Sequence, residues 1–312
     1  MTTLLTFRDN VKAFYSRYDY ILTPVIKFVA AFIIFRSINQ QFGYWSAFDN
    51  ALIMLVLAVV CAMLPSQVIT GISGVVIIIQ SLKVSLDVGL LCAALVIIFY
   101  SAYMRFVPKT GIIVFLVPLC YAFHLTFAFP ILLGFLVGPT AIIPACFGLL
   151  LYCYENCLSE LTKVLAAATS EDDTVSGFQY VIAELLDNKE LLVFEVVCTL
   201  VILITYCVYR LSVEHSWIIS FIVGGFLNIA LFLVCNVLLM VDIDIVSVVS
   251  GSIVGILFAC FIQFCKGVVD YQKTELLQFE DTEYYYYVKA IPKLSISGIS
   301  KNVKHINSKT KE

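Results

Sequence analysis

The residues with the clearest potential for chemistry are one histidine and two aspartates that interrupt or border long apolar segments. His124 is the one histidine in the run 110–154, which contains no Asp, Glu, Lys or Arg. An ionisable group inside a membrane span is a functional candidate, although a neutral, hydrogen-bonded histidine is an equally good structural interpretation. Asp242-Ile-Asp244 has the two-aspartate spacing that binds metal–nucleotide complexes in some glycosyl transferases. Because these aspartates open an apolar segment with no soluble domain around them, we favour a cap at a helix N-terminus.

Signatures of the common catalytic sites are absent. The sequence has no His-Glu-x-x-His, no Gly-x-Ser-x-Gly, no glycine-rich phosphate loop and no metal-spaced cysteines. Most of the 11 cysteines lie in or beside apolar runs and are interpreted as small hydrophobic residues. We therefore expect no catalytic residue, no metal site, no cofactor and no nucleic-acid partner.

Other residues could bind a solute within an apolar environment. Gly138 and Pro139, followed by Pro144, should kink or break a helix, because proline removes a backbone donor. Broken helices line binding sites in many transporters, while a plain kink is the commoner case. Asn228 and Asn236 need hydrogen-bond partners in hydrocarbon and should point inward. The candidate solute-binding residues are His124, Gly138, Pro139, Asn228 and Asn236.

Small residues recur at four-residue steps in three apolar segments. Such a stripe lies on one face of a helix, where another helix backbone can approach closely. The last two segments, 216–240 and 245–265, are expected to form a hairpin whose small faces meet. The residues expected to make the packing faces are Gly134, Gly138, Ser220, Gly224, Ser247, Gly251, Gly255 and Ala259.

The composition predicts an all-α polytopic integral membrane protein with a short β-prone tail. Of its 312 residues 61% are hydrophobic and 13% are charged, against about 25% charged in soluble domains. A crossing needs about 20 mainly apolar residues, and the apolar runs provide about eight to nine such spans. Segment 66–82 could be short or re-entrant, because Pro65 and a polar, glycine-containing stretch interrupt the apolar run.

The chain divides into five predicted parts. Residues 1–20 have the three- and four-residue apolar steps of an amphipathic helix in the membrane interface. The other parts are membrane helices 1–6 over 21–153, an acidic connector over 154–190, membrane helices 7–9 over 191–265, and a polar tail with strand-like segments and a basic end over 266–312.

The distribution of Lys and Arg predicts the orientation of the chain. Basic residues in the short loops place the N-terminus in the cytoplasm and the protein in the cell membrane. Nine crossings would put the tail outside, although Lys266 and Lys273 beside the last span favour the inside. Either segment 66–82 does not cross fully, or the tail is a translocated domain to which the rule applies weakly.

The tail contains two segments with the composition of strands. Leu276-Leu-Gln-Phe and Glu283-Tyr-Tyr-Tyr-Tyr-Val-Lys-Ala-Ile are rich in aromatic and β-branched residues. Two short strands are too few for an independent domain. We therefore expect them to need a partner protein, a second copy or the membrane surface.

Three stretches resemble a known group of proteins. At Arg105-Phe-Val-Pro-Lys-Thr-Gly, along the proline-rich stretch 130–148 and at Gln278-Phe-Glu-Asp-Thr-Glu-Tyr-Tyr-Tyr-Tyr-Val-Lys, the chain resembles uncharacterised multi-pass membrane proteins of Gram-positive bacteria. The four consecutive tyrosines are the most specific part. The resemblance implies residence in the bacterial inner membrane and a shared tail, and it implies no activity.

Three functions compete on these grounds. The leading hypothesis is a non-catalytic membrane component of an envelope-assembly or transport complex, because the packing faces and the tail favour protein partners or a homo-oligomer within the bilayer. The alternative is a secondary transporter or channel for a small solute, favoured by the proline-broken segment and the buried polar side chains. An intramembrane enzyme comes third, since it would need several polar catalytic groups at one depth.

Overall fold

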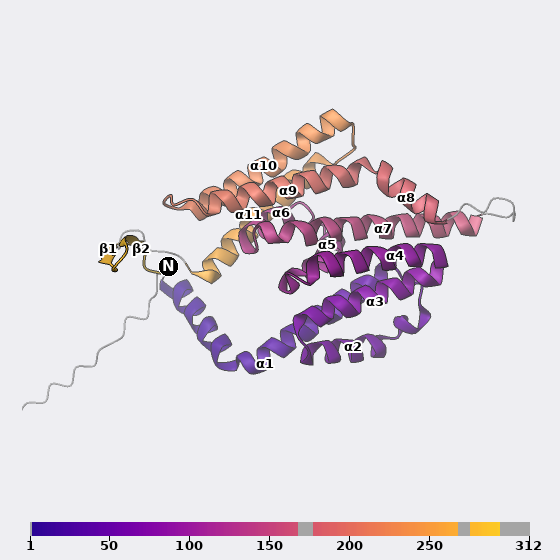
Figure 1. Cartoon of the computed structure of the whole chain (residues 1–312), viewed down its shortest axis with the longest axis horizontal. Helices are drawn as coiled ribbons and strands as arrows, with labels where there is room; N and C mark the ends of the chain where they lie inside the picture. The colour runs from indigo at the N-terminus through magenta and orange to yellow at the C-terminus, as the bar shows by residue number, and fades with distance from the viewer. Residues whose placement is uncertain (1, 168–176, 268–274, 294–312) are drawn as a thin grey trace, which may run out of the picture. The chain divides into compact units, whose positions relative to one another are not determined.

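The computed structural model describes residues 2–167, 177–267 and 275–293 and is mainly helical (Figure 1). Its α-helices are α1 (Thr2–Gln41), α2 (Ala51–Met63), α3 (Ser66–Val84), α4 (Leu86–Phe99), α5 (Ile113–Ala122), α6 (Phe129–Leu136), α7 (Ile142–Ala167), α8 (Gly177–Asp187), α9 (Lys189–Tyr209), α10 (Ser216–Leu239) and α11 (Ile245–Lys266). Short helical turns are η1 (Ser46–Asp49), η2 (Tyr100–Met104), η3 (Pro108–Thr110) and η4 (Pro139–Ala141), and the strands are β1 (Glu275–Glu280) and β2 (Tyr285–Ala290).

The chain forms two units. One contains residues 1–19 together with 263–312, and the other contains residues 20–262. Helix α1 runs through the boundary, where Tyr18 leaves helical geometry at φ −113° and ψ 19°. Pro24 lies shortly after this kink, and a proline inside a helix leaves the carbonyl four residues earlier without its partner. The predicted interfacial helix and the first span are therefore continuous in the chain, with a kink at Tyr18.

Within the described residues, seven helical segments are long and apolar enough to cross a membrane. They are Asp19–Gln40, Ser66–Val84, Leu86–Met104, Pro139–Lys163, Lys189–Tyr209, Ser216–Leu239 and Ile245–Lys266. Two further apolar segments, Ala51–Met63 and Pro108–Ala122, are shorter than a standard crossing. The structure thus supports a polytopic helical class with fewer full-length spans than the sequence suggested.

The short second span differs most clearly from the sequence-based expectation. We expected segment 66–82 to fall short, but α3 has 19 residues and the preceding α2 has only 13. Asn50 starts α2 late, since its side chain accepts a hydrogen bond from the Leu52 amide at 3.1 Å. Pro65 then separates the two helices. Local capping and proline chemistry therefore shorten α2 and leave α3 intact.

The proline-rich segment is broken, as predicted. Helix α6 ends at Leu136, Gly138 adopts φ +78°, and α7 begins after the turn η4. A side chain at Gly138 would collide with the Tyr206 ring at 2.6 Å. Glycine is needed there for its backbone conformation and for space.

The acidic connector is helical on both sides of the Glu171-Asp-Asp stretch, as the helical spacing of its apolar residues predicts. Helix α7 continues to Ala167, so the first part of the connector extends a membrane helix, and α8 forms the second part. Glu155, expected on a solvated connector, is only 6% exposed on α7. The predicted Glu171-Asp-Asp turn lies outside the described residues.

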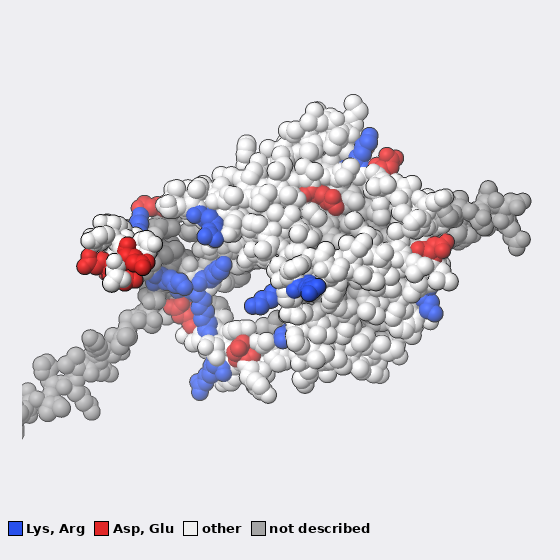
Figure 2. All heavy atoms as spheres, in the orientation of Figure 1, with Lys and Arg blue, Asp and Glu red and all other residues white. Residues whose placement is uncertain are grey.

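Helix α9 is central to the packing of the second half. It packs against α6, α7 and α10, and Val197, Val201 and Ile202 on it are fully buried. The surface of the 20–262 unit, in contrast, carries few charges over the face seen in Figure 2 and exposes many apolar side chains. A large exposed apolar surface indicates contact with lipid or protein.

In the smaller unit, residues 2–19 pack against the end of α11. The Lys12 ammonium donates a hydrogen bond to the Lys266 carbonyl oxygen at 3.0 Å, and the Arg8 guanidinium lies 5.8 Å from the centre of the Phe264 ring. Leu4, Phe7 and Phe14 remain more than half exposed, which suits a helix with one face in the membrane interface.

The tail forms the two strands predicted from its composition. Strands β1 and β2 pair antiparallel, with Leu277 opposite Val288 and Phe279 opposite Tyr286. Because directly opposite residues share a face, these four side chains make one apolar face. We refer to Leu277, Phe279, Tyr286 and Val288 as the hairpin face.

Candidate functional site: a polar cavity between helices α5, α7 and α9

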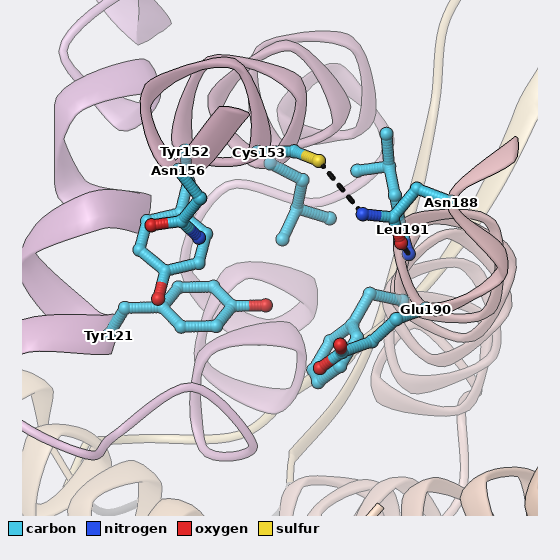
Figure 3. Close-up of a pocket in the computed structure, with 9 residues that line it drawn as sticks. Tyr121, Tyr152, Cys153, Asn156, Asn188, Glu190 and Leu191 are labelled. Carbon is cyan, nitrogen blue, oxygen red and sulfur yellow. Dashed lines mark hydrogen bonds between the residues drawn. The ribbon is translucent and has the colours of Figure 1, made fainter. Parts of the chain in front are cut away.

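A cavity of about 190 Å³ lies where the end of α5, the middle of α7 and the start of α9 meet. Tyr121 comes from the last turn of α5, and Tyr152 and Asn156 come from α7. The latter two are four residues apart and so share a face of the helix. Figure 3 shows Tyr121, Tyr152 and Asn156 on one side of this space and Asn188 and Glu190 on the other.

Asn188 fixes the start of α9 beside the cavity. Its side-chain oxygen accepts a hydrogen bond from the Leu191 amide at 2.9 Å, which is the standard role of an asparagine N-cap. Its side-chain amide donates to the Cys153 sulfur at 3.1 Å. One residue therefore caps α9 and ties it to α7, which places Glu190 in the first turn at the edge of the cavity.

The aromatic wall of the cavity is a stack of rings. Tyr121 and Tyr152 have ring centroids 3.8 Å apart and planes inclined by 19°, and Phe194 lies 5.9 Å from Tyr121. Such ring pairs add stabilisation beyond their buried area. The stack holds α5 against α7 and presents ring surface and the Tyr121 hydroxyl to the cavity (Figure 3).

A second hollow of about 420 Å³ shares part of this lining. Tyr121, Tyr152, Glu190 and Phe194 line both spaces. The second hollow continues to residues of the α5–α6 turn and of the α10–α11 connection: His124, Thr126, Phe127, Asp242, Ile243, Asp244, Ser247 and Ser250. Neither lining includes Lys or Arg, so carboxylates dominate the charge of the combined cavity.

Asp244 is the helix cap that its position predicted. Its carboxylate accepts hydrogen bonds from the Ser247 hydroxyl at 2.6 Å and from the Val246 and Ser247 amides at 3.1 and 3.3 Å. The Ser247 hydroxyl, followed by these amides, holds the pKa of Asp244 below its usual value, because hydrogen bonds to the charged form stabilise it. Asp244 therefore serves as the N-cap of α11, although it also borders the second hollow.

His124 lies in a turn and not within a helix. It adopts φ +55° between α5 and α6, and its side chain is exposed at the second hollow. The structure thus brings His124, Asp242 and Asp244 together around one space. His124 was expected inside a membrane span, but it lies in the turn between the short helices α5 and α6.

The other candidate solute-binding residues lie elsewhere. Gly138 and Pro139 form the break between α6 and α7 and line neither cavity. Asn228 is fully buried and donates to the Phe127 carbonyl at 2.8 Å and the Ser252 hydroxyl at 2.9 Å. Asn236 donates to the Ile243 carbonyl at 2.9 Å. Both asparagines point inward, and these bonds give them structural roles.

The small residues lie at close helix contacts, but their partners differ from those expected. Ser220 donates to the Thr205 carbonyl at 2.7 Å, and a side chain at Gly224 would meet the Thr205 hydroxyl at 2.4 Å. The stripe on α10 therefore faces α9. On α11, side chains at Gly251 and Gly255 would meet Phe127 at 2.8 Å and the Ala128 backbone at 2.9 Å. That stripe accommodates the segment before α6.

The other three packing candidates occupy different settings. An added side chain at Gly134 would lie 3.0 Å from the Ile202 carbonyl oxygen, so α6 and α9 approach closely there. Ala259 is buried with Phe135 and Phe221. Ser247 serves the Asp244 cap.

The main cavity residues were missed by sequence reasoning. Tyr121, Tyr152, Asn156, Asn188 and Glu190 come from three helices and form no sequence motif. The only local signal was the Tyr152–Asn156 spacing. Among the described residues, no three His, Cys, Asp or Glu side chains gather closely enough to hold a metal ion.

In comparisons with known proteins, no family model, no curated protein and no solved structure matches this chain.

Proposed function

We propose that the protein is a non-catalytic component of a membrane complex for envelope assembly or transport, and that its tail hairpin docks on a partner protein. The hairpin face carries the proposal. Its four apolar side chains remain 39–53% exposed, and an isolated two-stranded hairpin is marginally stable in water. A partner that covers this face would supply the missing packing.

The two faces of the hairpin differ in a way that favours this role. The opposite face mixes Gln278, Glu280 and Lys289 with Leu276, Tyr285 and Tyr287, which are 84%, 69% and 77% exposed. The hairpin face has no charged or amide side chain, whereas the opposite face has three. The hairpin face is therefore the expected contact surface.

Both chain ends are proposed to lie on the cytoplasmic side of the membrane. Residues 2–19 pack beside the end of α11 through Lys12 and Lys266, so the first and last apolar helices start and finish on one side. Arg8, Lys12 and Arg17 near the first span favour the cytoplasm. This arrangement removes the conflict raised by the lysines of the tail.

An even number of crossings follows, and α2 supplies the additional one. At one end of α2 the Lys27 ammonium donates to the Leu64 carbonyl at 3.3 Å. At the other end the Asn39 amide donates to Asp49 at 2.9 Å. Helix α2 therefore runs antiparallel beside α1 over a similar depth and can complete a crossing despite its length.

The pair α5–α6 is proposed to be re-entrant. Helix α6 ends just before Gly138, which lies beside Tyr206 near the end of α9. The Tyr103 hydroxyl, in the turn η2 that follows α4, donates to the Thr140 carbonyl. Arg105 and Arg210 follow these two tyrosines. The pair thus enters and leaves at the basic, cytoplasmic end of the 20–262 unit.

Matched tyrosine substitutions test the partner proposal. Tyr286 lies on the hairpin face and Tyr287 on the opposite face. We expect a partner to copurify at a fixed ratio with the wild-type protein and with Tyr287→Ser, and to be lost with Tyr286→Ser. Equal retention or equal loss in the two variants would contradict docking through this face.

The solute-carrier alternative is favoured by one specific observation, the polar cavity at α5, α7 and α9. Its lining combines ring surface, amides and a carboxylate beside a broken segment of the chain. Saturable uptake of a small solute into proteoliposomes by the purified protein alone would support this second function.

A further inference from the structure

We propose that the cavity between α5, α7 and α9 binds a small organic ammonium ion, either a free solute or the headgroup of a lipid. This inference concerns a different part of the protein from the hairpin face and does not depend on a protein partner. It is carried by three properties of the lining: its charge, its aromatic wall and its hydrogen-bonding groups.

The charge of the lining favours a cation. Glu190 is the charged residue of the smaller cavity, and Asp242 and Asp244 border the adjoining hollow. No Lys or Arg lines either space, and no ion pair of Glu190 is found in the part of the chain that the structure describes. An unpaired carboxylate at the edge of apolar helices gains from a cationic partner.

The aromatic wall favours an organic cation over a small hydrated one. The Tyr121–Tyr152 stack lies across the space from Glu190, and Phe194, one helical turn after Glu190 on α9, adds a third ring to the lining. Aromatic faces attract ammonium groups, and cages of aromatic rings with carboxylates recognise quaternary ammonium ligands. The described carboxylates and histidines do not gather at metal-binding distances, so the geometry suits a diffuse cation better than a coordinated metal.

The size and remaining polar groups set the chemical class. A cavity of about 190 Å³ is smaller than a drug-sized pocket of about 300–1,000 Å³. It therefore suits a compact amine with one polar substituent. The Asn156 side chain and the Tyr121 hydroxyl face this space in Figure 3 and can bond a hydroxyl group or an ester oxygen of the ligand.

Choline is a suitable probe because an uncharged molecule of the same shape exists. The full-length protein would be placed in nanodiscs of phosphatidylglycerol, which has no ammonium group, and equilibrium binding of radiolabelled choline measured. We expect saturable binding and at least tenfold weaker competition by 3,3-dimethylbutan-1-ol, in which carbon replaces the charged nitrogen. Absence of saturable binding, or equal competition by the uncharged analogue, would overturn the proposal.

Variants on one helix separate the site from general effects. Glu190→Gln should weaken choline binding by about tenfold, whereas Glu195→Gln, the same change on α9 outside the cavity, should leave it unchanged. Tyr121→Leu should also weaken binding, and Tyr121→Phe, which keeps the ring, should retain most of it. These comparisons use variants whose thermal unfolding matches the wild type, and equal binding by all of them would refute the assignment.

Lipid composition identifies the source of the ammonium group. If a headgroup fills the cavity, adding phosphatidylcholine to the nanodiscs should reduce the apparent affinity for free choline, and Glu190→Gln should abolish that reduction. An affinity independent of phosphatidylcholine assigns the site to a free solute.

Discussion

The Lys12 ammonium donates a hydrogen bond to the backbone carbonyl oxygen of Lys266 across 254 positions of sequence. This contact joins the helix at the start of the chain to the end of its last apolar helix. A carbonyl in the final turn of a helix has no intrahelical partner, and a cation there also favours the helix dipole. In the proposed topology this pair keeps both ends of the apolar region on one side of the membrane.

Reporter fusions test this arrangement directly. A reporter that is active only in the cytoplasm should be active at the N-terminus and also after residue 293. A fusion in the stretch 168–176, between α7 and α8, should be inactive, because it follows an odd number of crossings. An extracellular signal from the tail would require an odd number of crossings and refute the shared side.

Gly255 is expected to be the least replaceable of the small residues on α11. Its missing side chain would meet the Ala128 backbone at 2.9 Å, which cannot rotate away. Gly255→Ala should therefore destabilise the fold by about 1–3 kcal/mol through overpacking, measured by thermal unfolding in detergent. Ser250→Ala, an exposed position on the same helix, is the control and should change little.

Asn228 should contribute more to stability than Asn236. It is fully buried with two hydrogen bonds, whereas Asn236 is partly exposed and makes one. Loss of a bond that leaves a buried partner unsatisfied costs about 1–3 kcal/mol. Asn228→Ala should lower the unfolding temperature clearly more than Asn236→Ala, and the reverse order would show that Phe127 and Ser252 find other partners.

The cap at Asp244 predicts a pH dependence. Since the pKa of Asp244 is lowered in the folded state by Ser247 and the neighbouring amides, its carboxylate stabilises the fold above the ordinary aspartate pKa, about 3.9. This stabilisation is lost as the pH falls through the lower folded value. Asp244→Ala should unfold at a lower temperature than wild type at pH 6, and the difference should shrink at acidic pH. Asp244→Asn should behave nearly as wild type at pH 6, because asparagine also caps helices.

The features that could be predicted from the sequence are those decided by local chemistry. Asp244 directly precedes an apolar segment, so its role as a cap needed no tertiary information. Gly138-Pro139 breaks its helix for equally local reasons. The tail strands follow from their aromatic and β-branched content.

The choice of partners depended on the tertiary fold. Ser220 and Gly224 could face any helix that approaches closely, and the structure selects Thr205 on α9. The cavity is a similar case, since Tyr121, Asn156 and Glu190 are far apart in sequence and meet only after α5, α7 and α9 assemble. His124 was misplaced because an uncharged run does not reveal that two short helices turn inside it.

The most direct measurement of the central claim is native mass spectrometry of the protein extracted in a mild detergent. A non-catalytic component that docks through the hairpin face should appear with a different polypeptide at a fixed ratio, and the Tyr286→Ser variant should appear without it. The protein alone, or bound only to itself, would contradict the proposed role.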